Sequence, residues 1–227
     1  HLSIRRQRQM CIRDRSVGWN ADKYGDISSL DDLLDPKFAG TVALNGKPAE
    51  AGAAFNGYLM ANQLAGGDIN NLQPGLDYFK KLKEAGNLTT VDVTNGTIDS
   101  GQTGVVFDWT YNQASYKKEL KDKGVNWKYK TFPKAQVVSY YNQAINKDAP
   151  HPAAARLWEE YLYTADAQNL WFKGGANPVL LDSMKEDGTV DQATLKDAIT
   201  IEGEPVSYTN DDSTRITAVS YTHLTLP

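Results

Sequence analysis

The sequence predicts an α/β fold with a mainly parallel sheet. Short apolar runs alternate with helical patterns along most of the chain, which is typical of strands and helices packed in layers. The run Thr41–Leu44 leads through a loop of small residues, Asn45–Gly52, into a helical pattern. A strand that passes its C-terminal end to a helix in this way is the repeating unit of open α/β sheets.

Each predicted element follows from its local pattern. Pro152 suits the first turn of a helix. The apolar residues after it recur at helical spacing and predict a packed face, made of Ala155, Leu157, Trp158, Tyr161 and Leu162. By the same reasoning we expect helices at Ser29–Leu34, Gly52–Leu64, Gln73–Ala85, Ala114–Lys123, Pro152–Tyr163 and Ala165–Lys173. We expect strands at Thr41–Leu44, Leu88–Val91, Gly104–Trp109, Lys128–Phe132 and Val137–Ile145.

The two ends of the chain differ from the rest. Residues 5–15 read RRQRQMCIRDR and residues 219–227 read VSYTHLTLP. Both resemble translations of a transposase-type sequencing adapter, one in the forward sense and one in the reverse complement. We therefore predict that 1–15 and 218–227 are adapter-derived, have no packing role, and flank a fragment of a longer, metagenomic or similarly sequenced protein.

Charge and composition exclude several classes of function. Without residues 1–15, which hold five Arg and one Asp, 19 basic and 27 acidic side chains remain, a net charge of −8. An acidic chain lacks the excess of basic residues that binds nucleic acid or an anionic membrane. No apolar run in the sequence is long enough to span a bilayer. The single cysteine, Cys11, lies in the adapter-like segment, so neither a disulfide framework nor a thiol nucleophile is expected.

No arrangement typical of catalysis or of metal binding is present. With one histidine outside the terminal segments, His151, the sequence has neither a zinc set nor a clear general base. The stretch from Gly40 to Pro48 fails as a phosphate loop, because its glycines are wrongly spaced and Pro48 stands in the hydroxyl position. We therefore expect no catalytic residue, no cofactor and no metal site.

Three places bring polar or aromatic residues to the end of a strand. The first is the loop before the helix at Gly52, whose candidate ligand-binding residues are Pro48, Ala49, Glu50, Ala51 and Gly52. The second is VVFDWTYN at 105–112, with Asp108, Trp109 and Tyr111 as candidates. The third is SYYN at 139–142, with Tyr140, Tyr141 and Asn142. Alternation along a strand places the two tyrosines on opposite faces, so at most one of them faces a shared site.

These stretches resemble the extracellular solute-binding proteins of bacterial ABC importers, in the group that handles ferric ion, polyamines and phosphonates. The resemblance begins at Val17–Tyr24, VGWNADKY, includes APHPAAARLWEEYLY at 149–163 and TADAQNLWFKGGANPV at 164–179, and extends to about Ile201. It implies a periplasmic-binding-protein-like fold of type II and a receptor that is not an enzyme. The receptor would capture a small solute between two lobes and deliver it to a membrane permease. It would be a monomer, periplasmic or extracellular, with a lipoprotein tether as one option.

The resemblance also implies how the chain is divided. Residues 16–28 would leave the first lobe through the hinge, 29–136 would form the second lobe, and 137–217 would return through the hinge to the helical part of the first lobe. The initial βαβ units of the first lobe would be absent.

The solute class rests on the strand ends. Glu50 and Asp108, beside aromatic residues, favour an organic cation or zwitterion such as a polyamine, because carboxylates and aromatic rings both attract cations. Asp108→Asn would then weaken a cationic ligand. Ferric-ion and phosphonate binding are the alternatives within the group. The alternatives from other classes are a periplasmic hydrolase and a carbohydrate-binding module.

Overall fold

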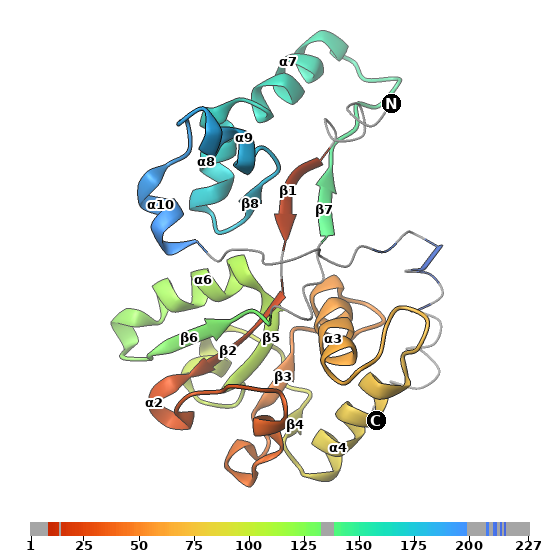
Figure 1. Cartoon of the computed structure of the whole chain (residues 1–227), viewed down its shortest axis with the longest axis vertical. Coiled ribbons are helices and arrows are strands. Elements are labelled where there is room, and N and C mark those ends of the chain that lie inside the picture. The colour runs from red at the N-terminus through yellow and green to blue at the C-terminus, as the bar shows by residue number, and fades with distance from the viewer. Residues whose placement is uncertain are drawn as a thin grey trace. The chain divides into compact units, whose positions relative to one another are not determined.

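The computed structural model describes residues 9–13, 15–132 and 139–198, together with 208, 211, 212, 214 and 216. The chain forms two compact units (Figure 1). The smaller unit comprises residues 1–14 and 138–200, and the larger unit comprises 15–137 and 201–227. This division resembles the lobe boundaries expected from the sequence, whereas the assignment of each unit to a lobe stays a prediction.

The larger unit is built on a five-stranded sheet of mixed direction. Its strands follow the order β4-β3-β5-β2-β6 and comprise β2 (Arg15–Asn20), β3 (Val42–Leu44), β4 (Leu88–Thr89), β5 (Val105–Trp109) and β6 (Trp127–Lys130). Strand β3 is parallel to β4 and β5, whereas β2 is antiparallel to β5 and β6. Four of the five strands run in the same direction, as expected for a mainly parallel sheet, and β2, which lies between β5 and β6, runs in the opposite direction.

The helices of the larger unit follow the predicted order. They comprise α2 (Ala21–Tyr24), η1 (Asp31–Leu34), η2 (Pro36–Phe38), α3 (Gly52–Leu64), α4 (Gln73–Glu84), α5 (Asn95–Asp99), α6 (Thr110–Glu119) and η3 (Lys121–Lys123). Helix α3 has the predicted bounds. Helix α6 begins four residues earlier than predicted, because β5 passes into it directly at Thr110 without an intervening loop.

The two faces of this sheet pack against separate hydrophobic clusters. Val105 and Phe107 belong to a cluster that includes residues of α3 and α4, whereas Val106 belongs to a second cluster with Ile98 and Trp127. Successive residues of a strand point to opposite faces. The same alternation places Asp108 on the face of Val106.

A buried polar network fixes α6 on this second face. Gln113 Nε2 donates to the carbonyl oxygen of Val106 at 2.9 Å, and Trp127 Nε1 donates to Gln113 Oε1 at 2.8 Å. A Cβ atom on Gly18 would overlap Gln113 Oε1 and lie 2.7 Å from Trp127 Nε1. Glycine at position 18 is therefore required by the close approach of Gln113 to β2.

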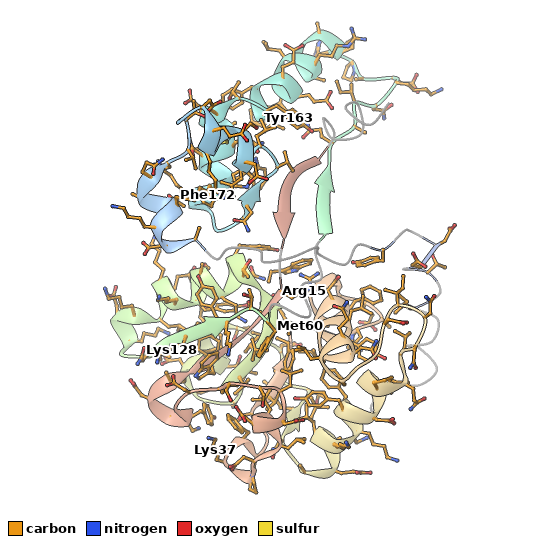
Figure 2. All side chains as sticks on the ribbon, viewed as in Figure 1. Arg15, Lys37, Met60, Lys128, Tyr163 and Phe172 are labelled. Atoms are coloured by element: carbon orange, nitrogen blue, oxygen red, sulfur yellow. The ribbon has the colours of Figure 1, made fainter. Side chains whose placement is uncertain are left out.

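In its described residues, the smaller unit contains a three-stranded antiparallel sheet and four helices. Strand β1 (Gln9–Arg13) lies between β7 (Ser139–Asn142) and β8 (Asn177–Pro178). The helices are α7 (Pro152–Leu162), α8 (Ala165–Lys173), α9 (Leu181–Glu186) and α10 (Gln192–Asp197). Phe172, Met184 and Val190 form the core beneath α8 to α10 (Figure 2).

Two sequence-based expectations need correction here. Residues 9–13 were expected to have no packing role, yet they form the central strand of this sheet, and Arg15 in the larger unit is 1% exposed. Strand pairing uses backbone groups, so a short apolar run such as MCI at 10–12 can complete a sheet whatever its origin. Their adapter origin stays a prediction, and residues 218–227 lie outside the described residues.

The predicted packed face of α7 is the second correction. Leu162 is buried, but Leu157, Trp158 and Tyr161 are 68%, 55% and 41% exposed. Ala155 is only partly buried. The helical spacing of these residues was predicted correctly, but their packing against the described part of the chain was not.

Candidate functional site

Two helices begin at the same edge of the larger sheet. Strands β3 and β5 are parallel neighbours with Leu44 opposite Phe107, so their C-terminal ends lie together. Helix α3 follows β3 after a short loop, and α6 follows β5 directly. Neither helix has a side-chain cap or an acidic residue in its first turn. Both first turns therefore place the positive end of a helix dipole at this edge of the sheet.

The loop before α3 is a compact turn. The N–H groups of Glu50 and Ala51 both donate to the carbonyl oxygen of Lys47, at 2.9 and 2.8 Å. Glu50 also pairs with Lys47 Nζ at 3.4 Å, and both side chains are largely exposed. Glu50, which we expected from the sequence to be a ligand group, thus has a cationic neighbour in Lys47. This pairing weakens the repulsion that Glu50 would exert on an anion at the start of α3.

Asp108 is fully buried at the end of β5, where four donors surround its carboxylate. Asp108 Oδ1 accepts from the Trp109 N–H at 2.7 Å and from Asn112 Nδ2 at 2.9 Å. Asp108 Oδ2 accepts from Asn45 Nδ2 at 2.7 Å and from the Tyr116 hydroxyl at 2.9 Å. A carboxylate has about four acceptor positions, so these protein donors satisfy it.

The electrostatics of this carboxylate follow from its burial. Desolvation raises the pKa of Asp108, and the four hydrogen bonds oppose that shift. Burial, together with the charge of Asp108, raises the pKa of Tyr116. All four donors are neutral, so the carboxylate is held by hydrogen bonds instead of a salt bridge. Asp108 thus joins the loop after β3 to helix α6, and its direct contact with a solute stays a prediction.

Trp109 lies on the opposite face of the sheet, beside Arg15. The two residues are directly opposite in the antiparallel register of β2 and β5. Arg15 Cζ lies 2.9 Å from the Trp109 ring centroid, and the Tyr111 ring stacks on Trp109 at 6.2 Å with an interplanar angle of 18°. Figure 2 shows Arg15 at the start of β2. Trp109 and Tyr111, both predicted as site residues, therefore form one aromatic stack at the start of α6.

The third predicted cluster belongs to the smaller unit. Tyr140, Tyr141 and Asn142 lie in β7, where the backbone of Tyr140 pairs with Ile12 and that of Asn142 with Gln9. Their side chains lie outside the described residues, so their part in a solute site stays a prediction.

Four residues of the site were not among the sequence candidates: Arg15, Asn45, Asn112 and Tyr116. Asn45 and Asn112 each follow a strand within a few residues, which is the same signal that identified Asp108. Tyr116 is one helical turn beyond Asn112, on the same face of α6. Arg15 was set aside as part of the adapter-like segment.

No set of three or more His, Cys, Asp or Glu positioned to hold a metal occurs among the residues that the structure describes. Within the same residues, no helix has the length and apolar character needed to cross a membrane.

Comparison with known proteins gives the family of the chain. Residues 13–198 match the model of the bacterial extracellular solute-binding proteins. The chain belongs to this family, whose members are transport-associated binding proteins. No curated protein sequence matches the chain.

Solved structures with the same fold bind varied solutes. AgtB from A. tumefacien in complex with agropinic acid is 19% identical, with a TM-score of 0.67. AfuA from Actinobacillus pleuropneumoniae with fructose-6-phosphate is 16% identical (TM-score 0.66), and iron-bound HitA from Pseudomonas aeruginosa is 21% identical (TM-score 0.64). The matches cover 95%, 96% and 94% of this chain and 68% of each of those chains. The chain thus spans about two thirds of their length.

Proposed function

We propose that the chain is part of the substrate-binding receptor of an ABC-type importer. The complete receptor captures a small polar solute outside the cytoplasmic membrane, releases it unchanged and delivers it to the membrane permease. Family membership supports this role, and the helix starts at the edge of the larger sheet supply the groups that a receptor needs.

The solute is proposed to carry an anionic group, either as a simple anion or as one end of a zwitterion. The observation that carries this proposal is the pair of uncapped helices, α3 and α6, at the C-terminal ends of the adjacent parallel strands β3 and β5. Free N–H groups and aligned peptide dipoles at a helix start favour negative charge. Arg15 lies within the segment predicted to be adapter-derived, so the helix starts themselves define the site.

A cationic solute, which the sequence favours, is the second candidate, and its support from the two carboxylates is weaker than expected. Asp108 was its expected partner, and four neutral protein donors already occupy that carboxylate. Glu50, the second carboxylate, pairs with Lys47. The zwitterionic option is supported by Tyr111, whose partly exposed ring lies beside the buried Trp109 ring. Neighbours solved with agropinic acid and with fructose-6-phosphate are consistent with an acidic organic solute.

The most direct test adds a competing carboxylate at the start of α3. Ala51 occupies the N-cap position with extended backbone angles, φ −120° and ψ 122°, which suit an Asp cap. Ala51→Asp should stabilise the protein by about 1 kcal/mol, the usual effect of a cap, because its side chain would accept from the first-turn N–H groups. The same contact should weaken binding of an anionic solute at least tenfold.

The binding measurement is isothermal titration of the complete protein, preceded by a thermal-shift screen of sulfate, phosphate, sugar phosphates, amino acid derivatives, spermidine and ferric ion. Ala65→Asp, at the other end of α3, adds the same charge and serves as the control that should leave affinity unchanged. Stabilisation by Ala51→Asp without loss of affinity would contradict the proposed site. Conversion of the bound solute into a product would contradict the receptor role.

A further inference from the structure

Tyr208 follows the smaller unit in the chain, yet it belongs to the larger unit. Its hydroxyl donates to Asn56 Oδ1 at 2.8 Å, across a separation of 152 residues in the sequence. Its ring packs edge-on against Phe55, with the ring centroids 5.7 Å apart and an interplanar angle of 70°. Both partners lie close to the start of α3, so a residue from the C-terminal part of the chain contacts the helix that follows β3.

The contact extends to the first residue of α3 through Asn56. This residue is 2% exposed, and its Nδ2 donates to the carbonyl oxygen of Gly52 at 2.8 Å. A carbonyl oxygen can only accept, so it requires the nitrogen side of the amide and leaves Oδ1 to the Tyr208 hydroxyl. Without that hydroxyl, a buried amide oxygen would lose its donor, which costs free energy. Tyr208 therefore stabilises the orientation of Asn56 that ties down the first turn of α3.

Attachment of the C-terminal segment does not by itself require this hydrogen bond. Ile216 is 0% exposed and belongs to the same hydrophobic cluster as Phe55. The Tyr208 ring packs against that cluster as well. The segment thus has apolar anchors of its own, and the hydroxyl of Tyr208 is aimed at α3 in addition to them.

We propose that Tyr208 is a positioning residue of the solute site, which acts through Asn56 on the first turn of α3 and does not touch the solute. This inference rests on the proposed function, in which an anionic group of the solute binds at the start of α3. A first turn that is already ordered loses little conformational entropy when a solute binds. Removing the Tyr208 hydroxyl should let this turn open more often and should weaken binding for that reason.

Hydrogen exchange reports on the first turn in the absence of any solute. The Phe55 N–H donates to the carbonyl oxygen of Ala51 at 2.9 Å, so it exchanges only when this turn opens. In the 227-residue chain, Tyr208→Phe keeps the ring and should speed exchange of this N–H about fivefold, the factor that corresponds to one hydrogen bond between neutral groups. The control is Tyr78→Phe, which removes another buried hydroxyl of the larger unit, bound to the carbonyl oxygen of Leu30 at 2.9 Å. It should leave exchange of the Phe55 N–H unchanged.

Two results of the exchange experiment would overturn the proposal. The first is an unchanged exchange rate of the Phe55 N–H in Tyr208→Phe. The second is equal acceleration in Tyr208→Phe and Tyr78→Phe, because the effect would then be one of overall stability.

A double variant tests whether Tyr208 acts through Asn56. In the Asn56→Ala background the hydroxyl has no amide partner, so Tyr208→Phe should change exchange of the Phe55 N–H by less than about twofold. Acceleration as large as that in the parent background would contradict the role of Asn56.

Binding gives the second readout, measured by isothermal titration of inorganic phosphate and of sulfate into the complete protein. Tyr208→Phe should weaken binding of the anion about fivefold, Tyr78→Phe should not, and the loss should disappear in the Asn56→Ala background. A loss that persists in that background would show that Tyr208 touches the solute and would overturn the positioning role. If neither anion bound the parent protein, the proposed solute site would be contradicted, whereas hydrogen exchange would still decide the role of Tyr208.

Discussion

Replacing Asp108 tests whether this residue positions the site or contacts the solute. Asp108 Oδ1 accepts hydrogen bonds from the Trp109 N–H and from Asn112 Nδ2. The backbone N–H of Trp109 can only donate, so in Asp108→Asn the side-chain oxygen of the new Asn must take the place of Oδ1. The amide nitrogen then takes the place of Oδ2. There the Tyr116 hydroxyl can accept a hydrogen bond, and the Asn45 amide can turn to present its oxygen.

All four contacts can therefore persist, and the cost of burying a charge is removed. We expect Asp108→Asn to change the free energy of unfolding by no more than about 1 kcal/mol. Asp108→Ala should instead destabilise the protein by about 4 kcal/mol, since it leaves four buried donors unsatisfied at about 1 kcal/mol each.

The assay is urea unfolding monitored by tryptophan fluorescence, with the m-value used to check that the denatured state is unchanged. Burial raises the folded-state pKa of Asp108 above 3.8. Stability contributed by its protonated form is therefore present below pH 3.8 and lost as pH rises through the folded pKa. The Asn variant should consequently gain stability relative to the parent protein as pH rises from 3.8 through the folded-state pKa of Asp108.

Solute binding separates the two roles. If Asp108 positions the helix starts, the Asn variant should retain affinity for the solute within about threefold. This reasoning would be refuted if Asp108→Asn lowered the free energy of unfolding as much as Asp108→Ala does. It would also be refuted if Asp108→Asn weakened solute binding tenfold without lowering stability. The second result would restore the direct contact expected from the sequence.

Two further predictions concern other parts of the larger unit. Gly18→Ala should destabilise the protein by about 1–3 kcal/mol because its methyl group would overlap Gln113, and Gln113→Ala in the same background should recover part of that loss in urea unfolding. Hydrogen bonds from Ser29 and Ser28 lower the pKa of Asp32 to about 2, so its stabilisation is present above pH 3.8 and lost as pH falls toward 2. Asp32→Asn should cost about 1 kcal/mol at pH 6 and almost nothing at pH 2, and an equal cost at both values would contradict the charge-based explanation.

Much of the larger unit was predictable because its signals are local. The bounds of α3 follow from a small-residue loop and an apolar run, and β5 from consecutive apolar residues before Asp108. The mixed direction of the sheet was not predictable, because the direction in which β2 pairs depends on residues about 90 positions away in β5. Local patterns carry no information on such long-range pairing.

The ends of β3 and β5, where polar residues follow, could be recognised in the sequence, but the contacts made there could not. The location of a solute site at this edge stays a prediction. The sequence could not show that Asn45, Asn112 and Tyr116 converge on Asp108, since each comes from a different turn or helix face. An isolated Asp therefore seemed to need a ligand, whereas the fold supplies its partners.

The convergence on Asp108 has a consequence for the energetics of capture. The loop that leads to α3 and the first turns of α6 share one anchor, so their N–H groups are held in place before any solute arrives. A receptor whose donors are already ordered loses little conformational entropy on binding, and a larger share of each hydrogen bond appears as affinity. For the proposed receptor, we therefore expect binding to order the larger unit only slightly.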